Sequence, residues 1–392
     1  MKKPSNSTKS KSVHVLLPAG KGLLKPKLRS AQRVGTTRVR SKIELSSPRE
    51  ESRVAASSAP FTFIDLFAGI GGIRLAFERV GGSCVFSSEW DKFSQQTYKA
   101  NFGETPAGDI TKVDASEVPD HDVLVGGFPC QPFSHAGLKR GFQDTRGTLF
   151  FDVARIIERR QPSMLLLENV KGFVGHDKGR TMKVVVESLE ALGYNVYFKL
   201  LNAKEFGVPQ NRQRIFIIGI NREKLGDVGF EFPRPPHSPT CVGRILEAEV
   251  DPRYTLSDRL WEGHQRRLAQ HQAKGNGFGY SIFDAASSYT STISARYYKD
   301  GSEILISQAP LNPRKLTPRE AARLQGFPDN FVIPVSDAQA YKQFGNSVAV
   351  PVIQAIAAEM VQVLLDVNHR VLRIAATQLS LFPRGEVVRQ GA

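Results

Sequence analysis

The chain has 392 residues, of which 41% are hydrophobic and 23% charged, an ordinary balance for a globular protein, and no apolar run approaches the roughly 18 residues that a membrane span requires. Its three cysteines are too few and too widely spaced for a disulfide framework or a paired-cysteine zinc site. The net charge of +15 is concentrated in residues 1–60, which carry 14 Lys and Arg against 3 Glu, so the nearly neutral remainder gives only weak support for polyanion binding.

The N-terminal region is rich in Lys, Arg and Ser and has no periodic apolar face that could be buried. Such a composition predicts a disordered basic tail, which we place at residues 1–57. A transit peptide has a similar composition, but a solvated tail or an over-long start is the commoner explanation of such a run. No apolar segment follows the basic residues, which argues against a secretory signal. The odd number and wide spacing of the cysteines favour a reducing cytoplasm.

Short apolar runs begin at Phe61 and are separated by amphipathic stretches. The runs are apolar on both faces, as expected of strands that helices cover on both sides. They read TFIDLFAG, SCVFSSEW, HDVLVGG, SMLLLENV, YNVYFKLL and RIFIIGI. Amphipathic stretches at residues 73–80, 149–160 and 181–192 lie between them. This alternation predicts a doubly wound α/β sheet.

The alternation stops near residue 221. The following residues contain scattered Gly and Pro and the charged stretch RLWEGHQRRLAQHQAKG, and we expect a less regular domain with strands near TSTISARYY and EILI. An apolar helix is predicted at residues 350–367, packed against the first domain. The sequence therefore predicts a large domain, a small domain and a C-terminal extension, at residues 58–221 with 339–370, 222–338 and 371–392.

A glycine-rich turn follows the first predicted strand, in FIDLFAGIGG. Glycines there allow backbone N–H groups to approach a ligand. Glu89 and Trp90 end the next strand, a place where an acidic residue binds ribose hydroxyls in dinucleotide sites, and the indole offers a face for adenine. Because no GxGxxG is present, the pattern favours an adenosine-containing cofactor other than NAD. Asp109 of GDIT either binds the adenine amino group or caps a helix.

Cys130 lies in GGFPCQPFS, directly after the predicted strand HDVLVGG. Open α/β sheets bind their ligands at the carboxyl ends of strands. A lone cysteine is more often a small buried hydrophobe, but Pro129 and Pro132 hold this loop away from regular structure. The sequence therefore predicts a presented thiol, which a modest electropositive field would activate as a nucleophile.

Charged residues lie near the ends of two further strands. Glu168 follows four apolar residues in SMLLLENV, so we expect partial desolvation to raise its pKa toward a value useful in proton transfer. A helix cap or a structural ion pair is the competing explanation. Arg212 and Arg214 of QNRQR alternate, which predicts that both point to one side and into one cleft.

The chain carries FIDLFAGIGG, GGFPCQPFS, ENV, QNRQR, RKLTPREAARLQGFPD and QFGNSVAVPV in this order. In the content and order of these motifs it resembles the bacterial DNA (cytosine-5) methyltransferases across residues 61–365. Several motifs of eight or more residues agree, which excludes chance. The resemblance implies a Rossmann-like methyltransferase domain and a second, smaller, irregular target-recognition domain.

The resemblance implies that the cofactor is S-adenosyl-L-methionine. Phe67 would lie against the adenine, Glu89 would bind the ribose, and Asp109 would hold the adenine amino group. The cofactor-binding residues expected on this basis are Asp65, Phe67, Gly69, Gly71, Glu89, Trp90, Asp109, Ile110, Pro129, Leu149, Asn346 and Ser347. No metal is expected.

The resemblance also implies a covalent mechanism on a cytosine that is flipped out of the duplex. Cys130 would attack C6, Glu168 would engage N3 and the exocyclic amine, and Arg214, with Arg212 beside it, would contact O2. C5 would then take the methyl group, and loss of the C5 proton and of the thiolate would restore the aromatic ring.

DNA contacts are expected on both sides of the cleft. The stretch HAGLKRGFQDTRGTLFF resembles a loop that closes over the flipped base, with hinges at Gly137, Gly141 and Gly147. Base-edge contacts are expected in GNGFGYS and SARYYKD of the small domain, where a solvated face explains the charges equally well. The DNA-binding residues predicted are Gln131, Ser134, Lys139, Arg146, Thr292, Arg296 and Lys299.

The small domain most resembles members that modify a cytosine within CCNGG or CCWGG sites. The resemblance implies a monomer that acts on double-stranded DNA at the nucleoid, in the bacterial cytoplasm, with or without a cognate restriction endonuclease. A transfer-RNA cytosine-5 methyltransferase is disfavoured, because Cys241 is followed by Val242 and Gly243 rather than by Phe-Thr. A catalytically silent DNA-binding protein is disfavoured because Cys130 and Glu168 are both present.

Overall fold

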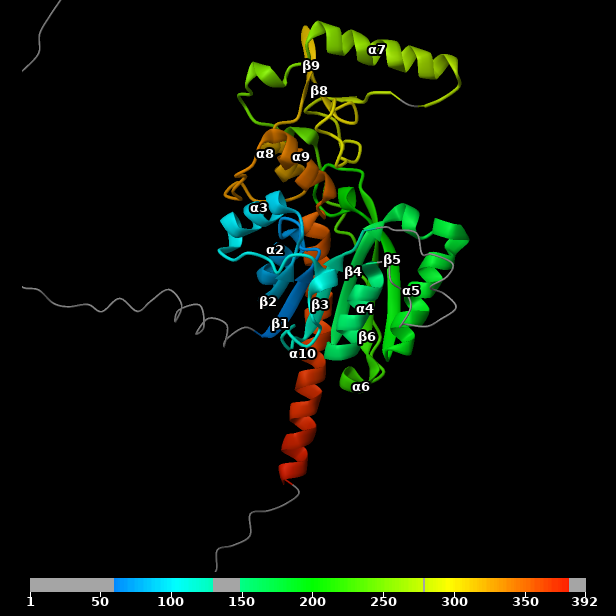
Figure 1. Ribbon diagram of the computed structural model, residues 1–392, viewed down its shortest axis with the longest axis vertical. Helices are drawn as coiled ribbons and strands as arrows, with labels where there is room; N and C mark the ends of the chain where they lie inside the picture. Colours follow the sequence, from blue (N-terminus) through cyan, green and yellow to red (C-terminus); the bar gives the residue numbers. More distant parts are fainter. Residues whose placement is uncertain (1–59, 130–148, 278, 381–392) are drawn as a thin grey trace, which may run out of the picture. The chain divides into compact units, whose positions relative to one another are not determined.

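Six strands form one mixed sheet in the order β2-β1-β3-β4-β6-β5 (Figure 1). The computed structural model describes residues 60–129, 149–277 and 279–380. Strands β2, β1, β3 and β4 are parallel, and β6 runs antiparallel to both of its neighbours. The strands are β1 Phe61–Leu66, β2 Gly82–Ser88, β3 Val123–Gly127, β4 Met164–Val170, β5 Tyr194–Asn202 and β6 Gln213–Asn221. Each of the six predicted apolar runs is therefore confirmed as a strand.

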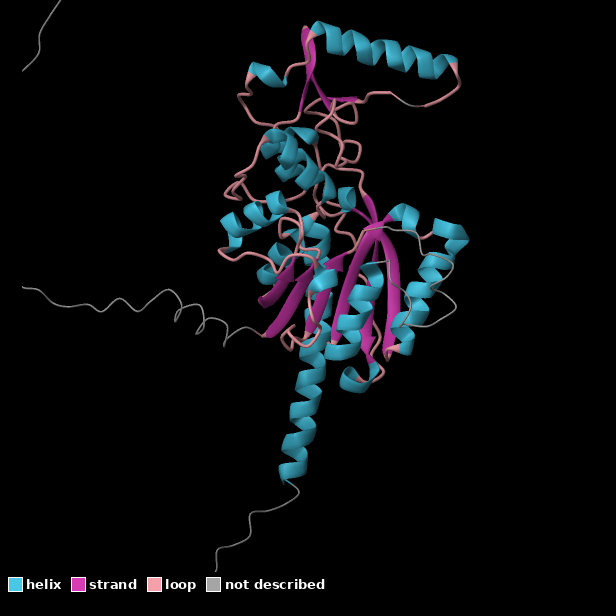
Figure 2. Ribbon diagram, in the orientation of Figure 1, coloured by secondary structure: helices cyan, strands magenta, loops and turns pink. Residues whose placement is uncertain are grey.

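Helices cover both faces of this sheet, as predicted for a doubly wound fold (Figure 2). Side chains alternate between the faces: Phe63 of β1 packs in the cluster beneath α2 and α10, whereas Ile64 packs in the cluster beneath α4 and α5. The helices of the first part of the chain are α2 Gly72–Arg79, α3 Lys92–Phe102, α4 Leu149–Arg160, α5 Arg180–Ala191 and α6 Arg222–Leu225.

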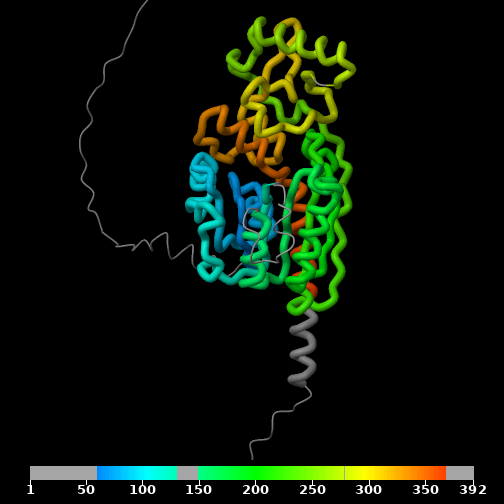
Figure 3. The backbone as a smooth tube through the Cα atoms, turned by 45° about the vertical axis from the view of Figure 1, so that its right-hand side comes forward, coloured from blue at the N-terminus to red at the C-terminus, as the bar shows by residue number. Residues whose placement is uncertain are grey.

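The predicted C-terminal helix is α10, Val350–Ser380, and its part up to residue 367 runs along the sheet (Figure 3). Ile353, Ile356, Met360 and Leu364 recur at helical spacing and are buried in the same cluster as Phe63. By length and composition one segment of the described chain, Asp337–Val367, could cross a membrane, but half of its apolar window is buried within the protein. Its burial is that of a core helix.

Strand β5 corrects one expectation from the sequence. Although its apolar run was expected to be covered on both faces, Phe198 and Leu200 are exposed. The reason is its position, because β5 is the edge strand beside β6. The other edge strand, β2, likewise leaves Val85 exposed.

Residues 222–338 contain a second, three-stranded sheet in the order β7-β8-β9. The strand expected near EILI is confirmed as β8, whereas the one expected near TSTISARYY is wrong. In that stretch only Thr290 makes a β-bridge, to Gln210. Its backbone partners, Pro209 and Asn211, belong to the loop before β6 and not to a strand, so no ladder forms, and the chain turns between Ser294 and Gly301. The elements are β7 Ile282–Phe283, β8 Leu305–Gln308, β9 Leu311–Lys315, α7 Asp258–Ala273 and α8 Pro318–Leu324, and α9 Asp337–Asn346 follows.

The charged stretch in this region forms the 16-residue helix α7, which the sequence did not predict. Ser257 caps its first turn, and Leu260, His264 and Leu268 are the less exposed positions of a narrow apolar stripe. The described residues between 60 and 380 belong to one compact unit, so the division into a large and a small domain stays a prediction. The predicted tail, residues 1–57, lies outside the described residues.

Short 3₁₀ turns complete the described elements. They are η1 Ile110–Lys112, η4 Lys171–Phe173, η5 His176–Gly179, η6 Ala203–Glu205, η7 Val242–Arg244 and η8 Pro252–Tyr254. Of these, η4 and η6 follow strands directly, and η1 and η6 bear on the sites described below.

Candidate functional site

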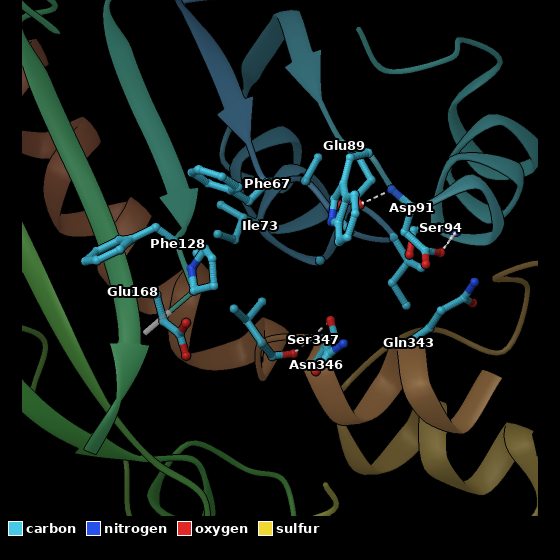
Figure 4. A pocket seen from close by; sticks show the side chains of 18 of the residues that line it. Phe67, Ile73, Glu89, Asp91, Ser94, Phe128, Glu168, Gln343, Asn346 and Ser347 are labelled. Atoms are coloured by element: carbon cyan, nitrogen blue, oxygen red, sulfur yellow. Dashed lines mark hydrogen bonds between the residues drawn. The ribbon is translucent and has the colours of Figure 1, made fainter. Parts of the chain in front are cut away.

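A cavity of about 630 Å³ opens at the carboxyl ends of the parallel strands. It lies where the strand order reverses, between β1 and β3, which is where open α/β sheets place their ligands. Figure 4 shows Glu168 and Phe128 on one side of this cavity and Glu89 and Asp91 on the other. One continuous space therefore joins cofactor residues such as Glu89 and Trp90 to the described catalytic residues Glu168, Arg212 and Arg214.

The turn from β1 into α2 forms the floor of the cavity. Phe67 adopts φ 56°, an uncommon conformation for a side-chain-bearing residue, and such outliers gather at ligand sites. Gly71 has φ 82°, and a Cβ there would lie 2.2 Å from Cε2 of Phe102. The turn is closed by the Gly71 N–H, which donates to the carbonyl of Ala68 (2.8 Å). Only glycine satisfies both the backbone angle and the close approach at position 71.

Glu89 is buried at the end of β2, and both of its carboxylate oxygens are held by backbone donors. The N–H of Gly69 donates to Oε2 (2.8 Å), and the N–H of Asp91 donates to Oε1 (2.7 Å). Burial raises the pKa of Glu89, although these two donors oppose the shift. Each oxygen keeps a lone pair, so the fixed carboxylate can accept two hydroxyl groups, as a ribose presents.

Aromatic and apolar side chains form walls suited to a flat base. Trp90 is 75% exposed, Ile110 is buried, and both line the cavity with Phe67. Asp109 also lines the cavity and caps the 3₁₀ turn η1, since its Oδ1 accepts from the Thr111 N–H (3.1 Å). Its hydrogen bonds to Thr111 lower the pKa of Asp109. The capping explanation for Asp109 is therefore confirmed, whereas binding of an adenine amino group stays a prediction that its place on the cavity wall permits.

The loop after α9 closes the cavity opposite the turn. Asn346 and Ser347 line it, and a Cβ on Gly72 would lie 2.8 Å from Oγ of Ser347, so the two segments are in close contact. Arg212 fixes this loop: its guanidinium donates to the carbonyls of Gly345 (3.1 Å) and Ser347. It also donates to the carbonyl of Ile293 (3.1 Å).

Glu168 and Arg214 form the charged pair at the other end. Nε of Arg214 lies 3.0 Å from Oε1 of Glu168, across the register pairing of β4 with β6. Burial raises the pKa of Glu168, and the nearby Arg214 and Arg212 oppose the shift. Burial likewise lowers the pKa of Arg214. The attraction between the two charged groups does not fully offset the hydration that they lose on burial. A polar ligand with complementary hydrogen-bonding groups would therefore stabilise the pair.

The end of β3 is braced against β4. Asn169 is buried and donates from Nδ2 to the carbonyl of Phe128 (2.9 Å), one residue before Pro129. A Cβ on Gly127 would lie 3.4 Å from Oε2 of Glu168, so a larger residue there would crowd the carboxylate. The backbone at Phe128, two residues before position 130, is therefore held beside β4, which carries Glu168.

The structure brings most of the predicted site residues together. The predicted cavity-lining residues are Phe67, Gly69, Glu89, Trp90, Asp109, Ile110, Pro129, Leu149, Glu168, Arg212, Arg214, Asn346 and Ser347. Asp65 and Gly71 are not among the residues that line the cavity: Asp65 is buried within β1, and Gly71 lies in the turn against the ring of Phe102. The predicted residues outside the described part of the chain are Cys130, Gln131, Ser134, Lys139 and Arg146, together with the hinges Gly137, Gly141 and Gly147.

The predicted DNA-binding residues of the small domain lie away from the cavity walls. Thr292 donates from Oγ1 to the carbonyl of Asn211 (2.6 Å), which places it against the loop that leads to Arg212. Arg296 and Lys299 are exposed on the turn that follows. In the described residues, no group of three or more His, Cys, Asp or Glu side chains could hold a metal ion.

Sequence reasoning missed several residues at the cavity. Gln343 is buried, lines the cavity, accepts from Thr97 (3.0 Å) and leaves Nε2 without a partner in the described structure. Lys342 pairs with Asp91 (2.9 Å) and joins α9 to α3. Asn169 follows Glu168 in a motif that pointed only to the carboxylate. The signal for Gln343 was its place three residues before Asn346 in QFGNSV.

Comparison with known proteins gives a consistent result. Residues 61–362 match the family model described as C-5 cytosine-specific DNA methylase. The chain is 62% identical over 306 residues to Type II methyltransferase M.SsoII of Shigella sonnei, covering 78% of this chain and 81% of that protein. It is 61% identical over 313 residues to Type II methyltransferase M.NlaX of Neisseria lactamica, covering 79% of this chain and 99% of that protein.

Solved structures share the fold at lower identity. A mutant of DNMT2 from Spodoptera frugiperda superposes with a TM-score of 0.62 at 22% identity, covering 78% of this chain and 99% of that one. The S. pombe Dnmt2 methyltransferase superposes with a TM-score of 0.61 at 20% identity, covering 79% and 99%. At these identities the likeness concerns the fold alone.

Proposed function

The chain belongs to the C-5 cytosine-specific DNA methylase family, and from this premise we propose which of its own side chains carry the family's reaction. The enzyme transfers a methyl group from S-adenosylmethionine to C5 of a cytosine in DNA. One observation supports the assignment below most directly: a single cavity is lined both by Glu89 and Trp90 and by Glu168 and Arg214.

The residues around the turn fit S-adenosylmethionine. A cavity of about 630 Å³ has the size of a small-molecule site. Glu89 accepts the ribose hydroxyls, Phe67 and Trp90 flank the adenine, and Asp109 accepts from its amino group. Asn346 and Ser347 face the methionine end. S-adenosylmethionine bound there supplies the electrophilic methyl group.

The opposite end of the cavity binds the cytosine. A base inside the duplex cannot present C5 and C6 to side chains, so the target nucleotide is flipped into the cavity. Glu168, whose pKa burial raises, shares its proton with N3 and accepts from the exocyclic amine. Arg214 holds Glu168 in place and donates to O2. Arg212 is a positioning residue, because its described partners are backbone carbonyls.

Cys130 supplies the nucleophile in this proposal. Its thiolate bonds to C6, which raises the electron density at C5 for the methyl group. Removal of the C5 proton then expels the thiolate and restores the ring. The support is its sequence position two residues after Phe128, whose carbonyl Asn169 holds.

The wider assignments rest on the relatives and on the motif order. We propose that residues 222–338 recognise the target, with Thr292, Arg296 and Lys299 among the DNA contacts. Relatives above 60% identity are Type II methyltransferases, which supports a modification enzyme acting beside a restriction endonuclease. We propose a monomer acting on nucleoid DNA in the cytoplasm, with CCNGG or CCWGG as the expected site.

Bisulfite sequencing of plasmid DNA after incubation with the purified protein and S-adenosylmethionine tests the function. One protected cytosine in one sequence context is expected, and the same experiment identifies the site. Transfer RNA serves as the alternative substrate. Methylation of transfer RNA alone would contradict the proposal.

Two substitutions test the assigned roles. Cys130→Ser should abolish methyl transfer, and Glu168→Gln should lower kcat by about 10²- to 10⁴-fold, the usual contribution of a positioned acid or base. Binding of S-adenosylmethionine, measured by calorimetry, should persist in both. Glu158→Gln, on the exposed side of α4, is the control. Substantial turnover by Cys130→Ser would contradict the covalent mechanism.

A further inference from the structure

A lysine and an exposed tyrosine form a pair beside the catalytic end of the sheet. Nζ of Lys204 lies 4.5 Å from the ring centroid of Tyr289. Tyr289 is 42% exposed and Lys204 is half-buried. Within the described residues, no carboxylate lies within ion-pairing distance of Lys204. Its ammonium group is therefore positioned by the cation–π contact with Tyr289 and not by an anion.

The segments that carry Lys204 and Tyr289 are both hydrogen-bonded to one loop, residues 209–212. Lys204 lies in η6, whose cap Asn202 donates from Nδ2 to Oδ1 of Asn211 (2.7 Å). Tyr289 precedes Thr290, whose N–H donates to the carbonyl of Pro209 (2.8 Å) and whose carbonyl accepts from the N–H of Asn211 (2.9 Å). The loop that leads to Arg214 therefore braces both members.

The sheet places Lys204 near the end of the cavity that carries Glu168 and Arg214. Strands β4 and β5 lie on either side of β6 (Figure 1). Both are antiparallel to β6 and therefore parallel to each other, so Lys204, just after β5, follows the same edge of the sheet as Glu168 in β4. Leu201 is the register partner of Arg214. The three residues from Leu201 to Lys204 span at most about 11 Å. That length corresponds to about three nucleotides at roughly 3.4 Å of rise each.

We propose that Lys204, positioned by the ring of Tyr289, binds a phosphate of the target strand within about three nucleotides of the flipped cytosine. This rests on the proposed function, because it assigns a further contact to the same DNA substrate. An ion-paired lysine would have to give up its carboxylate before binding a phosphate. Lys204 has no such partner in the described structure, and the ring keeps the flexible chain in place for the anion.

The salt dependence of DNA binding tests the contact. Each phosphate contact contributes about 0.9 to the slope of log affinity against log salt concentration. Lys204→Gln should reduce the slope by about 0.9, which makes the loss of affinity from about 50 to about 200 mM salt roughly 3.5-fold smaller. Lys204→Arg should keep the slope. Lys199→Gln, an exposed lysine in the middle of β5, is the control that should change it less.

Tyr289 is tested as a positioning residue. Tyr289→Phe retains an aromatic face and should bind DNA as the unaltered enzyme does, whereas Tyr289→Leu should reproduce part of the Lys204→Gln change in slope. Binding of S-adenosylmethionine should be unchanged in all of these variants. This comparison separates phosphate binding from a structural role, because loss of a structural contact would lower the melting temperature without changing the slope.

An unchanged slope in Lys204→Gln, in an enzyme that still methylates DNA, would overturn the inference and leave the proposed function intact. An unaltered enzyme without activity on any DNA would instead contradict the proposed function. Equal effects of Lys199→Gln and Lys204→Gln would also overturn it, since the contribution would then be nonspecific surface charge.

Discussion

Asp65 is fully buried in β1, and neither of its carboxylate oxygens has a hydrogen-bond partner in the described structure. Burial raises its pKa to about 8, although the charge of Arg74 opposes the shift and those of Glu89 and Glu78 add to it. In the unfolded chain the same carboxyl titrates near pH 4. The folded state therefore binds this proton more tightly, so its contribution to stability is complete below about pH 4 and is lost as the pH rises toward 8.

Asp65→Asn should remove this pH dependence. Between pH 5 and pH 8 the free energy of unfolding of the unaltered protein should fall by roughly 2–4 kcal/mol more than that of the variant, because each pKa unit corresponds to about 1.4 kcal/mol. Urea denaturation at both pH values measures the difference. Glu117→Gln, on an exposed side chain, should follow the unaltered protein. Parallel pH profiles for Asp65→Asn and the unaltered protein would show that Asp65 is charged in the fold.

The sequence predicted the environment of a single residue correctly where its position along a strand determines its burial. Glu168 lies near the carboxyl end of the buried strand β4, and its desolvation and raised pKa followed from that position. The alternation of Arg212 and Arg214 was a weaker guide, because Arg212 precedes β6 and its guanidinium binds the carbonyls of Ile293 and Gly345. Those carbonyls come from distant parts of the sequence, so no local pattern could identify them.

The turn between β1 and α2 is the element that most constrains the cofactor end. Gly71 has a positive φ and faces the ring of Phe102. Gly71→Ala should therefore lower the free energy of unfolding by about 1–3 kcal/mol and weaken binding of S-adenosylmethionine, because the turn must shift. Thermal unfolding and calorimetry measure the two effects. Gly172→Ala, where a Cβ would meet nothing within 4 Å, is the control. Equal behaviour of the two variants would contradict this role of the turn.

Elements were predictable where the periodicity was strong. The six strands and helices α4 and α5 followed from apolar runs and amphipathic spacing. Between residues 222 and 338 the pattern failed in both directions: TSTISARYY is β-prone but lies on a loop, and the charged stretch became α7. There, contacts to distant segments outweigh local propensity.

At the scale of the whole chain, the charge is divided unevenly. Residues 1–60 carry 14 Lys and Arg against 3 Glu. Deleting residues 1–57 should leave turnover on specific DNA nearly unchanged and weaken nonspecific binding at low salt, because counterion release scales with the number of phosphate contacts. Filter binding at two salt concentrations, with the melting temperature as a check on folding, measures this. A large loss of turnover or of folding would contradict it.

Arg212 connects two segments that are distant in the sequence, the one around Ile293 and the loop after α9 that closes the cofactor cavity. One guanidinium holds the carbonyl of Ile293, in the region proposed to read the DNA sequence, and the carbonyls of Gly345 and Ser347 at the methionine end. The methylated site could be changed by exchanging recognition regions between relatives. Such an exchange must preserve the hydrogen bond that Arg212 makes to this region. The grafted backbone must return a carbonyl to the place of residue 293, because otherwise a new sequence preference would come with a loosened cofactor loop.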